Sequence, residues 1–293
     1  MKIGDAFKLF KIQKIEVKIY SCYNIINFIE RVIFMNKNIL KDENFLKLEQ
    51  KLKIDKNILL FLDYDGTLSH FKKNPKTAYP VKGVKNIIKK ISESKFINIT
   101  IISGRNLEDL KEKIKLNNIN YAGLHGLEMK DYNPKNLNQN EIKYYINMIK
   151  EKYKEKINKD QLYLEDKKFV LSIHYRNNFK EVKKLKNFIN NLVDKKQFEV
   201  MEGRKIIEIR PKGWDKGKAV KMIRKKSFIN QSPFEIYIGD DTTDEDAFSV
   251  INGFSIYVKN EKEMSKQADF FLNSPDEVYK FLNKFNNTLK NLR

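Results

Sequence analysis

Cysteine, tryptophan and histidine are scarce in this chain of 293 residues, which contains one cysteine, one tryptophan and three histidines. The single cysteine, Cys22, excludes an internal disulfide framework and a CxxC zinc or redox site. His70, His125 and His174 lack the spacing of metal ligands, so we expect no zinc. This composition fits a reducing, cytoplasmic compartment.

Long apolar runs are absent as well. The segment 15–34 is rich in Ile, Tyr and Phe, but four charged side chains leave it short of the roughly 20 apolar residues that a membrane span needs. The chain also lacks the continuous apolar core and small-residue cleavage site of a secretory signal. We therefore expect no membrane span.

Arginine is rare among the basic residues. The chain has 58 Lys and Arg against 38 Asp and Glu, a formal charge of +20, yet only seven of the 58 are Arg. Proteins that read nucleic acids rely on Arg for bidentate contacts, and no helix-turn-helix, zinc-finger or RNP pattern is present. A lysine skew also arises from AT-rich codon usage. We expect no specific nucleic-acid partner, although general affinity for polyanions at low salt stays open.

The first 48 residues differ from the rest and form a predicted N-terminal extension of unknown role. Three interpretations stay open: a peripheral amphipathic helix, a family-specific extension, or an upstream start codon with Met35 as the true start. The remaining length and a hydrophobic content of 41% are enough for a sizeable packed core. We expect a monomer.

After residue 57, short apolar runs alternate with helical patterns, which is typical of a parallel sheet covered by helices on both faces. We predict a Rossmann-like α/β core formed by residues 49–130 and 213–293. The predicted strands are Ile58–Leu62, Ile97–Ile102, Tyr121–Leu124, Glu235–Ile238, Phe254–Val258 and Asp269–Leu272.

The middle of the chain breaks this alternation. A helical pattern over 138–159 precedes strand patterns at 162–165 and 169–175, and a second helix around 182–192 precedes strand patterns at 197–201 and 205–210. This order favours helices on one face of an antiparallel sheet. We predict an α+β cap domain, residues 131–212, inserted into the core.

Three predicted strands end in polar residues: Asp63 and Asp65 after the first, Ser103 and Arg105 after the second, and Asp240 and Asp241 after the fourth. Since ligands bind at the carboxyl ends of strands in open α/β sheets, these side chains should converge.

The predicted site is rich in carboxylates, with Asp63, Asp65, Asp240, Asp241 and Asp244. Crowded carboxylates cannot all stay ionised without a counter-charge. All-oxygen ligands suit Mg²⁺, so we predict a magnesium site at these residues, with Asp63 and Asp240 as the candidate side-chain ligands.

Carboxylates beside such an ion suit phosphoryl transfer. Asp63 is the candidate nucleophile, and Asp65 the candidate general acid and then base. Donors for the phosphoryl oxygens are Thr67, Ser103 and a lysine, for which we choose Lys216, with Lys218 as the alternative.

These motifs resemble those of the haloacid dehalogenase superfamily of phosphohydrolases: DxDGT at Asp63–Thr67, then Ser103, Lys216, and GDD at Gly239–Asp241 with Asp244. Further strings are similar to the trehalose-6-phosphate phosphatase family. They are LDYDGTL, ISGR at 102–105, GLHGLE at 123–128, HYR at 174–176, IEIRP at 207–211 and GDDTTDEDAF at 239–248.

The resemblance implies Mg²⁺-dependent hydrolysis of trehalose 6-phosphate through an aspartyl-phosphate, with the cap closing over the sugar. It also implies that several side chains contact the sugar phosphate. These are Arg105, His125, Arg176, Glu208, and either Arg204 or Lys205. Alternatives are a sucrose-phosphate or mannosyl-phosphoglycerate type of phosphatase, a sugar phosphomutase, or a non-catalytic polyanion-binding protein on the same fold.

Overall fold

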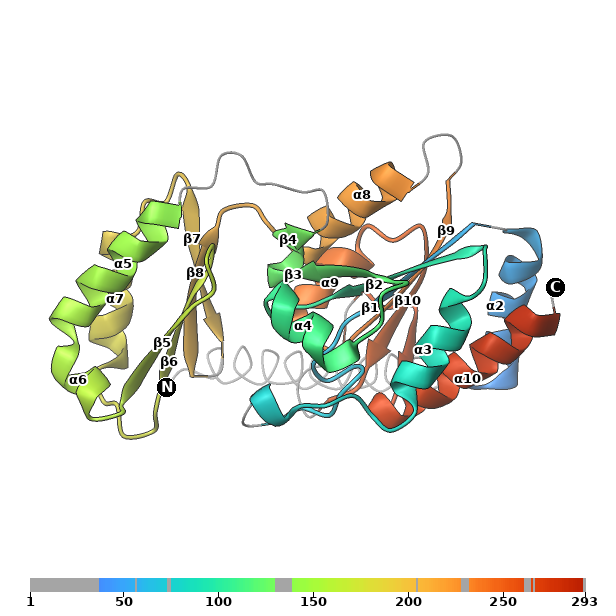
Figure 1. The fold of residues 1–293 in the computed structure, drawn as a ribbon, viewed down its shortest axis with the longest axis horizontal. Coiled ribbons are helices and arrows are strands. Elements are labelled where there is room, and N and C mark those ends of the chain that lie inside the picture. The colour runs from blue at the N-terminus through green and yellow to red at the C-terminus, as the bar shows by residue number, and fades with distance from the viewer. Residues whose placement is uncertain are drawn as a thin grey trace, which may run out of the picture.

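The computed structural model describes residues 37–55, 57–72, 75–129, 139–203, 205–227, 232–260, 265 and 267–291. These residues form two domains, a large sheet domain and a smaller cap, joined by two chain segments (Figure 1). Among them, no helix combines the length and the apolar character needed to cross a bilayer.

The large domain is built on a seven-stranded sheet of order β11-β10-β9-β1-β2-β3-β4, parallel except for β4 at one edge. The predicted α/β fold class is thus confirmed. The strands are β1 (Ile58–Leu62), β2 (Ile97–Ile102), β3 (Asn120–Gly123), β4 (Glu128–Met129), β9 (Phe234–Gly239), β10 (Gly253–Val258) and β11 (Phe270–Leu272).

Helices cover both faces of this sheet. All five residues of β1 are buried, because Leu60 and its neighbours on one face pack against α2, α3, α4 and α10, whereas Leu59 and Phe61 pack against α8 and α9. The helices are α2 (Asp42–Ile54), α3 (Val84–Ser92), α4 (Leu107–Ile114), α8 (Lys216–Ser227), α9 (Thr242–Phe248) and α10 (Pro275–Asn291), with short 3₁₀ turns η1 (Pro75–Thr77) and η2 (Leu124–Gly126).

Helix α2 crosses the predicted boundary at residue 48. Its Phe45 and Leu48 are buried in the sheet-domain core, and the Phe45 ring packs edge-on against Phe281 of α10. Part of the segment that the sequence assigned to an extension, residues 37–48, therefore belongs to the core. The rest of that segment, with Met35, lies outside the described residues.

The cap is a four-stranded antiparallel sheet of order β5-β6-β8-β7 with helices on one face. Its elements match the predicted order: α5 (Gln139–Lys152), α6 (Lys154–Asn158), β5 (Leu162–Asp166), β6 (Leu171–Tyr175), α7 (Val182–Leu192), β7 (Phe198–Gly203) and β8 (Ile206–Pro211). The helices lie on the side of the sheet away from the large domain (Figure 1), so the opposite sheet face turns toward it.

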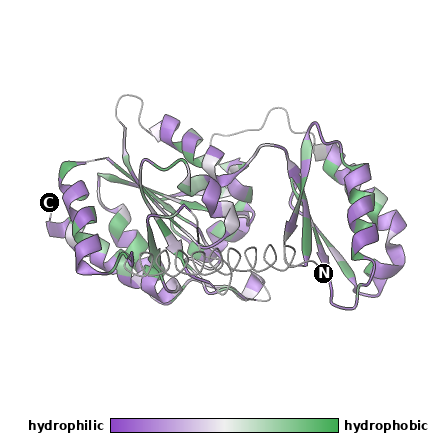
Figure 2. Cartoon of the chain, turned by 180° about the vertical axis from the view of Figure 1, so that it is seen from behind, coloured by the Kyte–Doolittle hydropathy of each residue, from purple (hydrophilic) through white to green (hydrophobic). Residues whose placement is uncertain are grey.

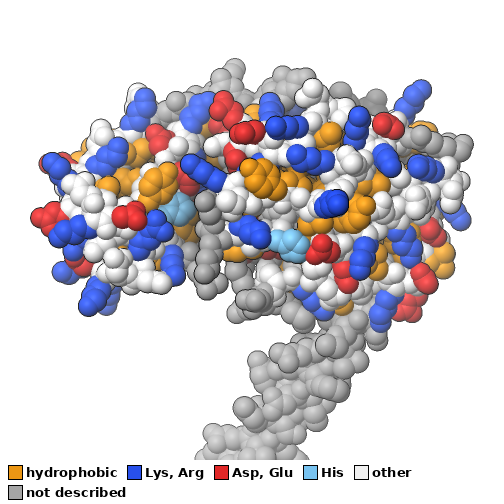
Figure 3. Space-filling view, turned by 60° about the horizontal axis from the view of Figure 1, so that its bottom comes forward, with side chains coloured by type: hydrophobic (Ala, Val, Ile, Leu, Met, Phe, Trp, Pro, Cys, Tyr) orange, Lys and Arg blue, Asp and Glu red, His pale blue; other side chains and the backbone are white. Residues whose placement is uncertain are grey.

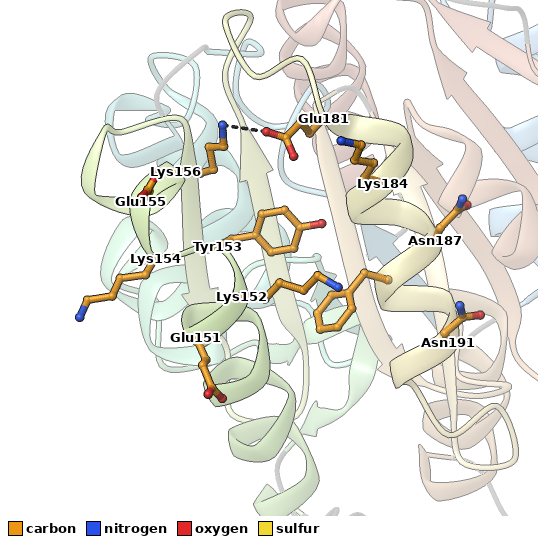
Figure 4. Close-up of a pocket in the computed structure, with 11 residues that line it drawn as sticks. Glu151, Lys152, Tyr153, Lys154, Glu155, Lys156, Glu181, Lys184, Asn187 and Asn191 are labelled. Carbon is orange, nitrogen blue, oxygen red and sulfur yellow. Dashed lines mark ion pairs between the residues drawn. The ribbon is translucent and has the colours of Figure 1, made fainter.

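Apolar residues concentrate inside each domain, and polar residues dominate the outer faces of the cap helices (Figure 2). A surface cavity of about 700 Å³ lies between the end of α5, α6 and α7, where Lys156 pairs with Glu181 at 2.7 Å and Lys152 covers the Phe188 ring (Figure 4). Because these helices lie on the outer side of the cap, this cavity is separate from the face that meets the large domain.

Basic side chains are dispersed rather than gathered on the face shown in Figure 3, where Lys and Arg alternate with Asp and Glu over both domains. A dispersed pattern is that of a solvated surface.

Candidate active site

The carboxyl ends of β1, β2 and β9 meet at the edge of the sheet that faces the cap. Leu62 pairs with Ile101 of β2 and with Ile238 of β9, so the residues that follow these strands emerge side by side. The amide of Asp63 donates to the Ile238 carbonyl at 2.9 Å. The predicted convergence of these strand ends is confirmed by this register.

Three of the predicted carboxylates form a compact cluster. Asp63, Asp240 and Asp244 each place one carboxylate oxygen within 4.8 Å of the others, and all three are buried. Burial raises the pKa of Asp63 well above its usual range, and the charges of Asp244 and Asp240 add to this effect. Burial and the Asp244 charge likewise raise the pKa of Asp240 to about 7. Three negative charges here need positive charge beside them.

Lys216, the first residue of α8, supplies one such charge. Its buried Nζ donates to Asp63 Oδ1 at 2.8 Å and to Asp244 Oδ1 at 2.7 Å. Burial opposes protonation, but the carboxylates of Asp244 and Asp63 outweigh it and raise the pKa of Lys216. Lys218 instead bonds the Gly213 carbonyl at 3.2 Å and is exposed. Lys216 is therefore the lysine that reaches the cluster.

Asp244 accepts four hydrogen bonds. Lys216 and the Tyr237 hydroxyl donate to Oδ1, each at 2.7 Å, and the amides of Asp240 and Asp241 donate to Oδ2 at 3.1 and 2.9 Å. A carboxylate offers about four acceptor positions, so these donors fill them. Asp244 thus fixes its neighbours rather than offering a free oxygen to a cation.

Asp241 caps helix α9 instead of joining the cluster, which corrects its predicted place among the metal ligands. Its Oδ1 accepts the amide of Thr242 at 2.8 Å, and Asp241 and Asp244 form a capping box. A short polar side chain at a helix N-cap satisfies amides that have no partner within the helix.

Asp240 carries an oxygen that suits a cation. Asn260 donates to Oδ2 at 3.2 Å, whereas Oδ1 is buried and has no hydrogen-bond partner among the described residues. The Thr67 hydroxyl is also buried and has no hydrogen-bond partner among the described residues. Gly66, with a φ of +82°, lies so close to the Asp240 carboxylate that any Cβ there would clash with it. Buried polar atoms of this kind are rare unless a ligand completes them.

Asp65 lies outside the carboxylate cluster, which corrects its predicted role as a metal ligand through its side chain. Arg105 donates from Nε to Asp65 Oδ2 and from Nη2 to Oδ1, each at 2.7 Å, and contacts Asp109 as well. Arg105, predicted to contact substrate, is buried and occupied by these carboxylates. The planar guanidinium fixes the orientation of the Asp65 carboxylate.

Ser103 and His125 lie side by side after β2 and β3. Ser103 is buried, and its carbonyl accepts the His125 amide at 2.8 Å. His125 has a φ of 56°, and a Cβ at Gly104 would stand 2.9 Å from its ring. Burial and the charge of Lys216 lower the pKa of His125 to about 3, so the imidazole is neutral.

The cap contributes Glu208 from β8. The Ser172 hydroxyl and the Lys167 ammonium both donate to Glu208 Oε1, Lys167 at 3.3 Å. Although burial opposes ionisation, Lys167 and His125 lower the pKa of Glu208. Glu208 stands on the cap and His125 on η2 of the large domain, so the predicted pair is divided between the two domains.

Arg176 is not brought to this site. Its side chain is 64% exposed and lies 3.4 Å from Asp160, so it does not pair with Glu208. The start of β6 adjoins the loop that packs on the large domain, and Arg176 follows the other end of this strand. Arg176 therefore lies at the end of the cap sheet that is far from the site. Arg204 lies outside the described residues.

Sequence reasoning missed three residues that hold the site together: Tyr237, Asn260 and Lys167. Asn260 follows β10, so the rule of strand ends applied to one more strand would have found it. Lys167 has no signal among so many lysines, and Tyr237 reads as an ordinary buried strand residue.

Known proteins are similar to this chain in sequence and in fold. The model of the family described as trehalose-phosphatase matches residues 61–276. Probable trehalose-phosphate phosphatase C of Arabidopsis thaliana is 33% identical over 254 residues, covering 78% of this chain and 77% of its own.

Solved structures are also similar to this chain in fold. The C-terminal domain of C. albicans trehalose-6-phosphate phosphatase superposes with a TM-score of 0.70 at 25% identity, covering 86% of this chain and 98% of its own. A haloacid dehalogenase-like hydrolase from Bacteroides thetaiotaomicron shares the fold, with a TM-score of 0.58 at 17% identity over 78% of this chain and 98% of its own. The chain belongs to the trehalose-phosphatase family of phosphoric monoester hydrolases.

Proposed function

We propose that this protein is a cytoplasmic, Mg²⁺-dependent phosphatase that hydrolyses trehalose 6-phosphate to trehalose and phosphate. The observation that carries the proposal is the buried cluster of Asp63, Asp240 and Lys216 at the sheet edge that faces the cap. The identity to relatives whose names state a trehalose-phosphate phosphatase activity supports the choice of substrate.

Asp63 and Asp240 are the side chains that would hold Mg²⁺. Both are buried carboxylates, Asp240 Oδ1 has no partner among the described residues, and hard oxygen ligands are those that Mg²⁺ prefers. When bound, the ion neutralises negative charge and orients the phosphoryl oxygens. Asp244, whose acceptor positions are filled, would position Lys216 and the backbone of Asp240 beside these ligands.

Asp63 is the proposed nucleophile. Its carboxylate oxygen bonds to phosphorus as the bond from phosphorus to the sugar oxygen breaks, giving an aspartyl-phosphate and a sugar alkoxide. Asp65, which gives up one of its two hydrogen bonds from Arg105 when it carries a proton, donates that proton to the sugar oxygen, so trehalose leaves as a neutral alcohol. Asp65 then takes a proton from the water that attacks phosphorus, which releases phosphate and restores Asp63.

Donors are in place for the oxygens of the transferred group. Lys216 lies against Asp63, Thr67 presents an unpartnered hydroxyl, and Ser103 follows the adjacent strand. Preorganised donors of this kind stabilise the charge that builds up in the transition state. Glu208 from the cap and His125 from the large domain would contact the sugar that carries the phosphate.

Phosphate release from a panel of sugar phosphates tests this proposal. The purified protein should release phosphate from trehalose 6-phosphate with Mg²⁺ present and lose that activity in excess EDTA. Asp63→Asn should be folded and inactive. Equal rates on sucrose 6-phosphate would contradict the substrate, undiminished turnover in EDTA would contradict the metal, and retained activity in Asp63→Asn would contradict the nucleophile.

A further inference from the structure

The face of the cap sheet that turns toward the large domain carries two rows of side chains. In the first row, Glu165 of β5 pairs with Ser172 of β6, which pairs with Glu208 of β8. In the next row, Tyr163 pairs with His174. Residues two apart on a strand share a face and lie about 6.8 Å apart, so the rows are separated by that distance.

The first row adjoins the catalytic centre. The loop between β5 and β6 packs against the large domain, with Phe169 in contact with the cluster of Leu124 and Trp214. His125 of the large domain belongs to the same region, since the Trp214 indole donates to its carbonyl at 3.1 Å. The first row therefore lies next to the edge of the large domain that carries the catalytic centre, and the second row lies one strand repeat further away.

The second row presents an aromatic ring. Tyr163 is 56% exposed on the sheet face that turns toward the large domain. Its ring centroid lies 5.8 Å from that of His174, and Glu165 holds His174 Nε2 at 3.0 Å. An exposed ring beside fixed hydrogen-bonding groups matches both parts of a sugar ring, whose C–H face is apolar and whose rim carries hydroxyls.

We propose that Tyr163, with His174 beside it, forms the subsite for the unphosphorylated glucose ring of the substrate and thereby selects a disaccharide phosphate over a monosaccharide phosphate. This inference rests on the proposed function. The phosphorylated ring lies over the first row on its Glu165 side, and the distal ring stacks on Tyr163, two residues along β5 from Glu165, because the spacing of the two rows is comparable to that of neighbouring rings in a disaccharide.

Kinetics of Tyr163→Ala and Tyr163→Phe test this subsite. Trehalose 6-phosphate is the full substrate, and glucose 6-phosphate, measured as a substrate or as a competitive inhibitor, lacks the distal ring. Tyr163→Ala should lower kcat/KM for trehalose 6-phosphate about tenfold, mainly through KM, and leave the glucose 6-phosphate constant within about twofold. Tyr163→Phe keeps the ring that stacks on the sugar and should retain most of the kcat/KM that Tyr163→Ala loses.

Tyr144→Ala is the matched control, since Tyr144 is 52% exposed on α5, on the opposite side of the cap. It should leave both constants unchanged. An unchanged KM for trehalose 6-phosphate in Tyr163→Ala, or equal losses on both sugars, would overturn the subsite while leaving the proposed function intact. Failure of the unaltered protein to prefer trehalose 6-phosphate would overturn both.

Discussion

Arg105 holds both carboxylate oxygens of Asp65, each at 2.7 Å, in a side-by-side pair at the edge of the site. Two hydrogen bonds from one planar group fix the rotation of the carboxylate as well as its position. Arg105 therefore holds the proposed general acid and base, Asp65, in a fixed orientation.

Replacing Arg105 by lysine should separate charge from geometry. Lysine keeps the positive charge but cannot hold two oxygens in one plane. In Arg105→Lys we expect kcat for trehalose 6-phosphate to fall at least about tenfold with a smaller change in KM, because Asp65 loses its orientation. Arg176→Lys, on the exposed Arg176, should leave kcat unchanged. An Arg105→Lys variant with more than half of the original kcat would show that the pairing does not matter for catalysis.

The two lysines near the start of α8 offer a second comparison. Lys216→Met removes the ammonium between Asp63 and Asp244, so we expect kcat to fall by about a hundredfold or more. Lys218→Met removes an exposed ammonium that contacts the Gly213 carbonyl and the Trp214 ring, away from the carboxylates, and should keep nearly full activity. Steady-state phosphate release distinguishes the two, and similar losses in both variants would argue against Lys216 as the phosphoryl donor.

Tyr237 contributes through its hydroxyl, which is one of the four donors to Asp244. Tyr237→Phe keeps the ring between Phe61 and Phe248 but leaves a buried acceptor unfilled. We expect the free energy of unfolding to fall by about 1–3 kcal/mol and kcat to fall about tenfold, because Lys216 and Asp240 lose a fixed neighbour.

Tyr121→Phe is the control for Tyr237→Phe, since the Tyr121 hydroxyl donates to the Leu116 carbonyl at 2.7 Å, away from the site. Chemical denaturation should show a loss of stability in both variants, with kcat reduced in Tyr237→Phe alone. Equal kcat values in the two variants would mean that the Tyr237 hydroxyl serves stability only.

Metal-free protein should lose stability as the pH rises. Burial and the Asp244 charge raise the pKa of Asp240 from 3.8 to about 7, so the folded state keeps a proton that the unfolded chain has released between these values. The free energy of unfolding therefore falls as the pH rises through this window. Mg²⁺ takes the place of the proton, so its stabilising effect should be small near about pH 5 and large near about pH 8.

Thermal unfolding with and without Mg²⁺ across this range measures both effects. Asp240→Asn should flatten the pH dependence of the metal-free protein and reduce the stabilisation by Mg²⁺. A metal-free melting temperature that does not respond to Asp240→Asn at any pH in the window would rule out this account.

The fold followed closely from the sequence, because buried parallel strands and amphipathic helices leave strong patterns. The exceptions lack such patterns. The helix predicted over 138–159 is interrupted at Tyr153, where no Gly or Pro marks a break. The first part of helix α2, up to residue 48, was predicted as part of an extension, although its Phe45 and Leu48 pack in the core, because this helix precedes the first predicted strand.

The sequence predicted which residues form the site better than it predicted the contacts that they make. Strand ends predicted that Asp63 and Asp240 would meet, but not that Asp65 would turn to Arg105 or Asp241 to the helix amides. Both choices depend on side-chain rotamers and nearby partners. Arg176 was predicted from the family resemblance and from the rarity of arginine, neither of which shows at which end of the antiparallel cap sheet its side chain lies.

Trp214 gives this protein a built-in optical reporter. It is the only tryptophan, lies two residues before Lys216 on the segment that returns from the cap, and packs with Phe169 of the cap and Leu124 of the large domain. Its indole donates to the His125 carbonyl at 3.1 Å. Any swing of the cap during turnover changes this environment, so intrinsic fluorescence can follow opening and closing in real time without a label.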